Sequence, residues 1–126
     1  MPAPPDGRLP KLGLRPNQVT TQDEELRWGA WQKLEPLPFD GDVDAAADRL
    51  IEVAKSFERT AFVERDGLYL SFTFSTRWFT DDVEFLIAPD EGVVHFRSAS
   101  RLGWGDKGVN RRRMKRFSSR WADSGA

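Results

Sequence analysis

Hydrophobic residues recur with two different periods along the chain, and the two periods predict different elements. Between residues 60 and 99, apolar and polar residues alternate in short runs, as they do in strands that bury one side. Over residues 43–57 and 108–121, apolar residues recur every three or four positions, which predicts two amphipathic helices. Asp42 stands where the N-cap of the first helix would lie. A short first strand is predicted at residues 32–34, ended by the prolines that follow it.

The first hairpin is predicted around Asp66 and Gly67, because an Asp-Gly pair between alternating runs favours a two-residue turn. Its strands are residues 60–65 and 68–76. One side of this hairpin is then apolar, and the other side carries hydroxyl groups together with Phe62. The expected cross-strand pairs are Arg65 with Leu68, Glu64 with Tyr69, Val63 with Leu70, Phe62 with Ser71, Ala61 with Phe72 and Thr60 with Thr73.

The second hairpin is predicted between residues 82–88 and 93–99, which are rich in Val, Ile and Phe and flank a Pro-Asp-Glu-Gly turn. A symmetric turn fixes the register of the two strands. The expected cross-strand pairs are Ala88 with Val93, Ile87 with Val94, Leu86 with His95, Phe85 with Phe96, Glu84 with Arg97, Val83 with Ser98 and Asp82 with Ala99. The pair of Glu84 with Arg97 has two interpretations. It is an ordinary salt bridge that adds little stability, or Glu84 holds Arg97 in position to bind an anionic or carbonyl group.

The predicted order of elements is β-α-β-β-β-β-α, which defines a single α+β domain. The apolar sides of both hairpins are expected to cover the helices, so the sheet is antiparallel and curved, with both helices on one face. This order looks like the TATA-binding-protein-like arrangement, with the first strand beside the last, and such a fold does not fix a function. We expect an irregular, proline-rich arm over residues 1–19, the domain over residues 20–121 and a frayed tail over residues 122–126.

The side of the sheet that faces away from the helices is the candidate ligand site. It mixes hydroxyl groups, a phenol, the single histidine and the Glu84–Arg97 pair. The candidate ligand-binding residues are Tyr69, Ser71, Thr73, Glu84, His95 and Arg97. A curved sheet would make this side a shallow groove, and a plain solvated face is the common alternative.

Two neighbouring acids, Asp81 and Asp82, open the second hairpin. Paired acids can bind a divalent cation, but neighbours on a strand point to opposite faces. We therefore expect Asp81 or Asp82 to bond to an arginine, with Arg97, Arg101 and Arg111 as the candidates.

The loop over residues 100–108 leads into the second helix and contains three glycines. Asp106 stands where this helix would be capped. The glycine spacing matches neither of the common phosphate-binding fingerprints, so a phosphate site here has little support. The outer side of the helix is basic, with Arg112, Lys115 and Arg116, which is typical of a solvated face and is also compatible with nucleic-acid binding.

Composition removes several classes of chemistry. The chain has no cysteine and one histidine, which excludes disulfides, thiolate nucleophiles and metal sites built on cysteine or several histidines. We therefore expect no metal and no cofactor. The formal net charge is −1, so the whole chain is not a general nucleic-acid binder. No apolar run reaches the length of a membrane span and the N-terminus lacks a signal-peptide pattern, so we expect a soluble cytoplasmic protein.

Three stretches of the chain carry a family resemblance: RPNQVTT (residues 15–21), DDVEF (81–85) and FRSASRLGWGDKGVNRRR (96–113). They resemble a bacterial and plastid family catalogued as domain-of-unknown-function family 1499. Family members often have a cysteine in the first stretch, where this chain has Gln18. The resemblance implies no reaction. The positions that it carries over are Asp82, Glu84, Phe85, Arg97, Ser98, Ser100, Arg101, Gly103, Asp106, Gly108, Asn110 and Arg111. We expect part of this set to form a structural network: Asp82, Ser98, Ser100, Arg101, Asp106, Asn110 and Arg111.

Three classes of function remain open. The first, which we favour, is a non-catalytic binding or structural module that recognises a small polar or anionic ligand or a protein partner. The second is an enzyme that uses Glu84, Asp82 or His95 as acid or base, with Arg97 or Arg101 as an electrophilic clamp. The third is nucleic-acid binding through the basic helix, which requires its basic side chains to form one exposed patch. The catalytic residues of any enzyme reaction stay unknown at this point.

Overall fold

The computed structural model describes residues 8–10, 18–22, 28–76, 79–101 and 108–125. In chain order its elements are β1 (Gln18–Thr20), the 3₁₀ helix η1 (Ala30–Gln32), β2 (Leu37–Pro38), α1 (Val43–Lys55), β3 (Thr60–Asp66), β4 (Tyr69–Ser75), β5 (Thr80–Ala88), β6 (Val93–Ser100) and α2 (Val109–Ser124).

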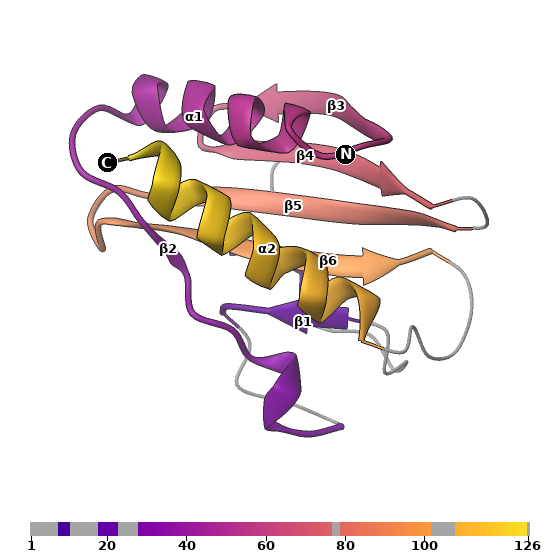
Figure 1. Cartoon of the computed structure of the whole chain (residues 1–126). Helices are drawn as coiled ribbons and strands as arrows, with labels where there is room; N and C mark the ends of the chain where they lie inside the picture. Colours follow the sequence, from indigo (N-terminus) through magenta and orange to yellow (C-terminus); the bar gives the residue numbers. More distant parts are fainter. Residues whose placement is uncertain (1–7, 11–17, 23–27, 77–78, 102–107, 126) are drawn as a thin grey trace.

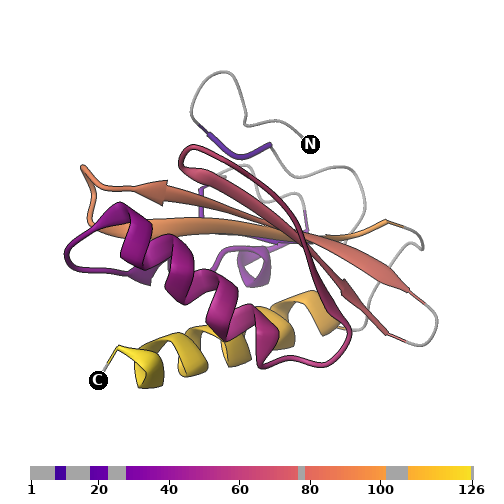
Figure 2. The same cartoon turned by 90° about the horizontal axis from the view of Figure 1, so that it is seen from above.

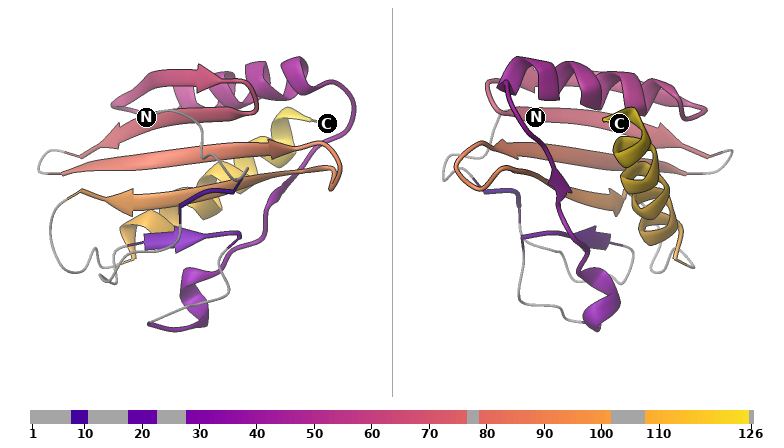
Figure 3. Two further views of the ribbon diagram at one scale, coloured as in Figure 1. Left: turned by 180° about the vertical axis from the view of Figure 1, so that it is seen from behind. Right: turned by 60° about the vertical axis from the view of Figure 1, so that its left-hand side comes forward.

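The strands form one antiparallel sheet with the two helices on a single face. Within the described residues the strand order is β1-β6-β5-β4-β3, and β2 pairs with the other end of β6 (Figure 1). Figure 3 shows β3 and β1 at opposite edges of this sheet. Figure 2 shows α1 and α2 together on one face, with residues 8–10 on the other. The predicted α+β class, with an antiparallel sheet and both helices on one face, is confirmed.

The core fills the space between the sheet and the helices. The ring of Phe85 on β5 lies between Phe72 on β4 and Phe96 on β6, with ring centroids 5.6 and 6.5 Å away. Phe117 of α2 packs over them, 5.0 Å from Phe85. Leu50 from α1 is fully buried in the same cluster. The apolar sides of both amphipathic helices therefore meet the aromatic side of the sheet, as their periods predict.

The predicted helix positions are close to those observed. The backbone N–H of Ala45 donates to Oδ2 of Asp42 at 3.2 Å, so the predicted N-cap is confirmed. The helix α1 ends at Lys55, and α2 continues to Ser124, three residues beyond its predicted end. Asp106, the predicted cap of α2, lies outside the described residues.

The second hairpin has the predicted register at every pair. Ala88 lies opposite Val93, and the pairing continues without interruption to Asp82 opposite Ala99. The symmetric turn and the alternating pattern favour the same register, because a shift by one residue would place the apolar side chains on the wrong face.

The predicted register of the first hairpin is wrong. The two turn residues are Gly67 and Leu68, and Asp66 pairs with Tyr69. Gly67 has a φ of 59°, which suits the first central position of a two-residue hairpin turn. A bulge between Phe62 and Glu64 shifts the register once more. Phe62 is therefore opposite Phe72 on the helix side, with ring centroids 5.3 Å apart, and not on the polar side.

The predicted first strand at residues 32–34 is also wrong. Gln32 belongs to η1, and Lys33 makes only an isolated bridge to Thr20. The strand that pairs with the main length of β6 is β1, which begins at Gln18 within the segment assigned to the proline-rich arm. Because β1 pairs with β6, the first strand does lie beside the last one.

Candidate functional site

Four side chains form a buried polar cluster on the side of the sheet away from the helices. We call them the sheet-face cluster: Gln18, Tyr69, Glu84 and Arg97. Nη1 of Arg97 donates to Oε1 of Glu84 at 3.0 Å, and the Tyr69 hydroxyl donates to Oε2 at 2.8 Å. Nη2 of Arg97 donates to Oε1 of Gln18 at 2.8 Å. The predicted Glu84–Arg97 pair is confirmed, with Gln18 as a further partner.

Hydrogen bonds between its own members satisfy most polar atoms of the cluster. The Glu84 side chain is 2% exposed and that of Arg97 is 14% exposed, so their interaction is little screened by water. Both η nitrogens of Arg97 and both oxygens of Glu84 have protein partners. Nε of Arg97 is buried, and none of the described residues accepts a hydrogen bond from it.

The pKa of Tyr69 is raised well above the ordinary value of 10.0, first because the phenol is buried. Glu84 raises this pKa further, because its carboxylate accepts a hydrogen bond from the neutral phenol and repels the phenolate. Since the folded state favours the neutral phenol, this contribution to stability is complete below pH about 10 and is lost as the pH rises further. Tyr69 is the single tyrosine of the chain, so tyrosinate absorbance reports on it alone. We expect the folded protein to show almost no tyrosinate at pH about 10.5 and the tyrosine of the urea-unfolded chain to be about three-quarters ionised. Ionisation near pH 10 in the folded protein would contradict the buried bond to Glu84.

His95 lies on the same side of the sheet but outside the cluster. Its Nδ1 is 3.0 Å from the hydroxyl of Thr21, and its Nε2 is 3.1 Å from Oε1 of Glu91. Ser71 is buried opposite Glu84, and Thr73 is half-buried opposite Asp82. The structure therefore brings together Tyr69, Glu84 and Arg97 from the candidate site, with Ser71 beside them, and places His95 and Thr73 apart.

A segment near the N-terminus covers part of this side. Leu9 is 5% exposed and packs with Tyr69 and Leu86. Its backbone N–H donates to Oε1 of Gln22 at 2.8 Å. The candidate groove over these residues is thus filled by the chain itself.

The three candidate acid–base residues have separate partners. Asp82 receives two hydrogen bonds from Arg101, at 2.9 and 3.0 Å, in an exposed fork. Glu84 belongs to the sheet-face cluster, and His95 bonds to the exposed Glu91. The expected bond between Asp82 and Arg101 is confirmed.

The remaining motif residues lie on the helix side of the sheet. The Ser98 hydroxyl donates to Oδ1 of Asn110 at 2.5 Å, and Nδ2 of Asn110 donates to the Ser100 hydroxyl at 2.9 Å. Nη1 of Arg111 donates to the backbone oxygen of Trp31 at 2.6 Å. These contacts tie the first turn of α2 to β6 and to η1.

Asp81 has a partner that the sequence interpretation missed. Its Oδ2 is 2.6 Å from Nη2 of Arg113, and the two side chains are 1% and 5% exposed. Arg113 is not among the expected arginine partners, and the expectation that Asp81 or Asp82 bonds to one of them is met by Asp82 and Arg101. The helical period could have found Arg113, because it is three residues after the buried Asn110 and four before the buried Phe117.

A cavity of about 390 Å³ lies between the end of α1, the end of β4 and one side of α2. We call it the arginine cavity, because Arg113, Arg116 and Arg120 line it from successive turns of α2. The remaining lining residues are Ser56, Phe57, Glu58, Phe74, Ser75, Thr76 and Val109. Nothing in the sequence pattern marks this cavity, because its walls come from segments far apart along the chain.

Aromatic rings support the three guanidinium groups. Cζ of Arg120 lies 4.0 Å from the centre of the Phe57 ring, and Cζ of Arg116 lies 5.7 Å from it. Cζ of Arg113 lies 5.3 Å from the centre of the Phe74 ring. Such stacking holds a guanidinium in place while leaving its edge available for hydrogen bonds.

The charges in the arginine cavity are unbalanced. Asp81 neutralises Arg113. Arg116 and Arg120 are exposed, and no acid among the described residues lies within ion-pair distance of either. Arg120 donates to the backbone oxygen and the hydroxyl of Ser56, at 2.9 and 3.1 Å. Glu58 is the single acid in the lining, so the cavity carries a net positive charge.

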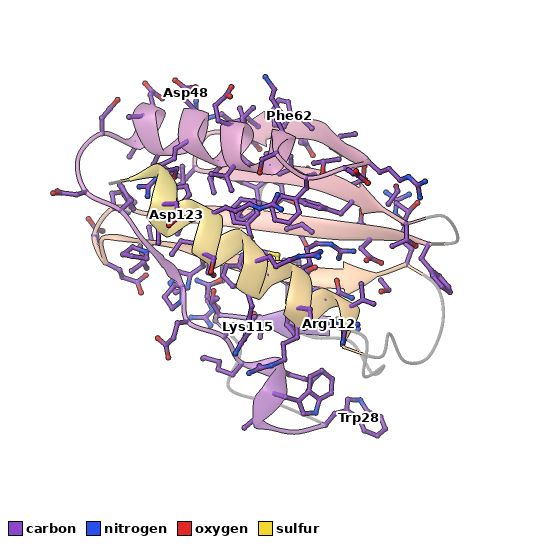
Figure 4. All side chains as sticks on the ribbon, in the orientation of Figure 1. Trp28, Asp48, Phe62, Arg112, Lys115 and Asp123 are labelled. Atoms are coloured by element: carbon purple, nitrogen blue, oxygen red, sulfur yellow. The ribbon has the colours of Figure 1, made fainter. Side chains whose placement is uncertain are left out.

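Other basic residues lie on the same helix outside the cavity. Figure 4 shows Arg112 and Lys115 on α2, where both are exposed. Neither lines the arginine cavity.

In the described part of the chain, neither helix combines the length and the apolar character that crossing a membrane requires. The cytoplasmic location stays a prediction.

Comparison with known proteins gives one match. The model of a family described as "Protein of unknown function (DUF1499)" matches residues 8–120. A search of curated proteins and a search of solved structures found no match. The matched region covers most of the 126 residues, so the chain belongs to the DUF1499 family of proteins of unknown function.

Proposed function

We propose that the chain is a non-catalytic binding module that holds a small oxyanion, a phosphate or a carboxylate group, in the arginine cavity. The observation that carries this proposal is the pair of exposed guanidinium groups, Arg116 and Arg120, without an acidic partner among the described residues. Guanidinium forks match the geometry of phosphate and carboxylate oxygens and bind them through paired hydrogen bonds.

The sheet-face cluster is less suited to an anion. Both η nitrogens of Arg97 already donate to protein oxygens, and the carboxylate of Glu84 would repel a second negative group. We infer that this cluster stabilises the fold, and that the binding function lies on the helix side of the sheet.

The separation of the acid–base candidates supports a non-catalytic role. Glu84 and His95 lie across the sheet from the arginine cavity, and each of them is bonded to other side chains. General acid–base catalysis needs such a group within hydrogen-bond reach of the bound molecule.

The proposal predicts binding of inorganic phosphate that depends on Arg116. In isothermal titration, replacing Arg116 with glutamine should weaken phosphate binding by about tenfold or more, because hydrogen bonds to charged groups contribute about 1.5–3 kcal/mol. Arg112→Gln is the matched control, since it removes the same charge from the same helix outside the cavity. Its phosphate affinity should change by less than about threefold.

Two outcomes would contradict the proposal. One is that neither phosphate nor acetate binds to the wild-type protein. The other is an equal loss in both variants, which would indicate general attraction by the basic helix. An oligonucleotide that binds more tightly than phosphate, with the same loss in both variants, would instead support the nucleic-acid alternative.

A further inference from the structure

The wall of the arginine cavity contains one acidic residue, Glu58, together with its three arginines. Glu58 is exposed, so its carboxylate is open to a molecule in the cavity. No base among the described residues lies within ion-pair distance of it, and the nearby Lys55 pairs with Glu52 instead, at 3.6 Å. The cavity therefore presents an anion without a partner as well as the cations Arg116 and Arg120.

The backbone of Glu58 is held on both sides by hydrogen bonds. On one side the N–H of Phe57 donates to the backbone oxygen of Ala54 at 3.0 Å, at the end of α1. On the other side the backbone oxygen of Arg59 accepts from the N–H of Ser75 on β4, also at 3.0 Å. The fold therefore keeps the acid on the wall formed by this loop, while the cations extend from α2.

The charges of the cavity indicate which ligand would match it. Guanidinium groups bind oxyanions, whereas a carboxylate accepts hydrogen bonds and attracts a cation such as an ammonium group. Because Asp81 neutralises Arg113, the two other arginines and Glu58 leave one net positive charge in the cavity wall. An aminoalkyl phosphate carries a dianionic phosphate and one ammonium group, so its net charge is the opposite one.

We infer that the arginine cavity recognises a small zwitterion, in which a short carbon chain joins a phosphate or carboxylate group to an ammonium group. This inference rests on the proposed function, because Arg116 and Arg120 hold the oxyanion. Glu58 binds the ammonium group and thereby determines the specificity of the cavity. The volume of about 390 Å³ is within the range of small-molecule sites.

The test compares matched probes by isothermal titration at pH about 8, where phosphate monoesters are dianions and alkyl amines are protonated. Phosphoethanolamine and β-alanine carry an ammonium group, and ethyl phosphate and propionate are their counterparts without it. In the wild-type protein the better-bound zwitterion should bind about fivefold more tightly than its counterpart. Tighter binding of phosphoethanolamine than of β-alanine would identify phosphate as the preferred oxyanion, and the reverse would identify carboxylate.

Glu58→Gln removes the charge of the acid while keeping the size of the side chain. It should abolish the advantage of the zwitterion, and it should tighten the binding of ethyl phosphate by about twofold, because a repelling charge is lost. Glu52→Gln is the matched control: Glu52 is also exposed, and it lies on α1 outside the cavity. This variant has the same net charge and should keep the fivefold advantage of about the wild-type size.

The outcomes separate the two proposals. Equal affinities for zwitterions and simple anions in the wild type, with binding that still depends on Arg116, would overturn this inference and leave the proposed function standing. An undiminished advantage in Glu58→Gln, or an equal loss of it in Glu52→Gln, would also overturn the inference. Absence of binding by all four probes would overturn the proposed function itself.

Discussion

Replacing Asp81 with alanine is expected to lower the free energy of unfolding by about 3–5 kcal/mol, because it leaves a buried guanidinium without its counter-ion. Arg113 is 5% exposed at its side chain and has Asp81 as its acidic partner among the described residues. Urea unfolding followed by tryptophan fluorescence measures the effect directly.

The neighbouring residue provides the control. Asp82→Ala removes the same side chain from the next position of β5, but the bond to Arg101 is exposed, with side chains 37% and 54% accessible. Its loss should change the free energy of unfolding by less than about 1 kcal/mol. Similar effects of the two substitutions would show that burial of the Asp81–Arg113 pair has no energetic consequence.

Replacing Glu84 with alanine should have the second largest effect, a loss of about 3 kcal/mol, since it removes the counter-ion of Arg97 and leaves Nη1 of Arg97 and the Tyr69 hydroxyl without their acceptor. The same substitution at Glu91, whose side chain is 60% exposed beside His95, should change stability by less than about 1 kcal/mol. Paired thermal melts of the two variants provide the comparison. If Glu84→Ala has the same melting temperature as the wild type, the sheet-face cluster does not stabilise the fold. Its assignment as a ligand site then becomes the better interpretation.

The second hairpin is the part that sequence alone predicts fully. Its turn is symmetric and its apolar residues alternate, so local turn chemistry and burial favour the same register. The ion pair of Glu84 with Arg97 follows from that register without any further assumption. The two helices can also be predicted from the sequence, because their apolar residues follow the helical period closely.

The first hairpin could not be predicted at the level of single residues. Gly67 can occupy either central position of a two-residue turn, and the choice moves every later pair. The observed turn uses Gly67 and Leu68, and the bulge beside Val63 then places Phe62 opposite Phe72 on the helix side. Both positions of Gly67 in the turn leave the apolar side chains of β4 facing the helices. The apolar pattern of β4 therefore does not show which position is used.

Short strands and composite sites depend on distant partners. The strand β1 has three residues, and its pairing with β6 joins positions about eighty residues apart, so no local pattern marks it. The arginine cavity depends in the same way on where α2 crosses the end of α1. The helical period identifies Arg113, Arg116 and Arg120 as neighbours on one side of α2, but only the fold adds Phe57 and Phe74 opposite them.

The most direct test of the oxyanion site is a nuclear magnetic resonance titration of the arginine side chains with inorganic phosphate. Arginine Nε–Hε signals can be followed individually once they are assigned by substitution. We expect saturable shifts of the signals of Arg116 and Arg120, with the signal of Arg101 on the other face of the sheet unchanged. Shifts that spread evenly over all arginines and grow without saturation, or no shifts at all, would contradict an oxyanion site in the arginine cavity.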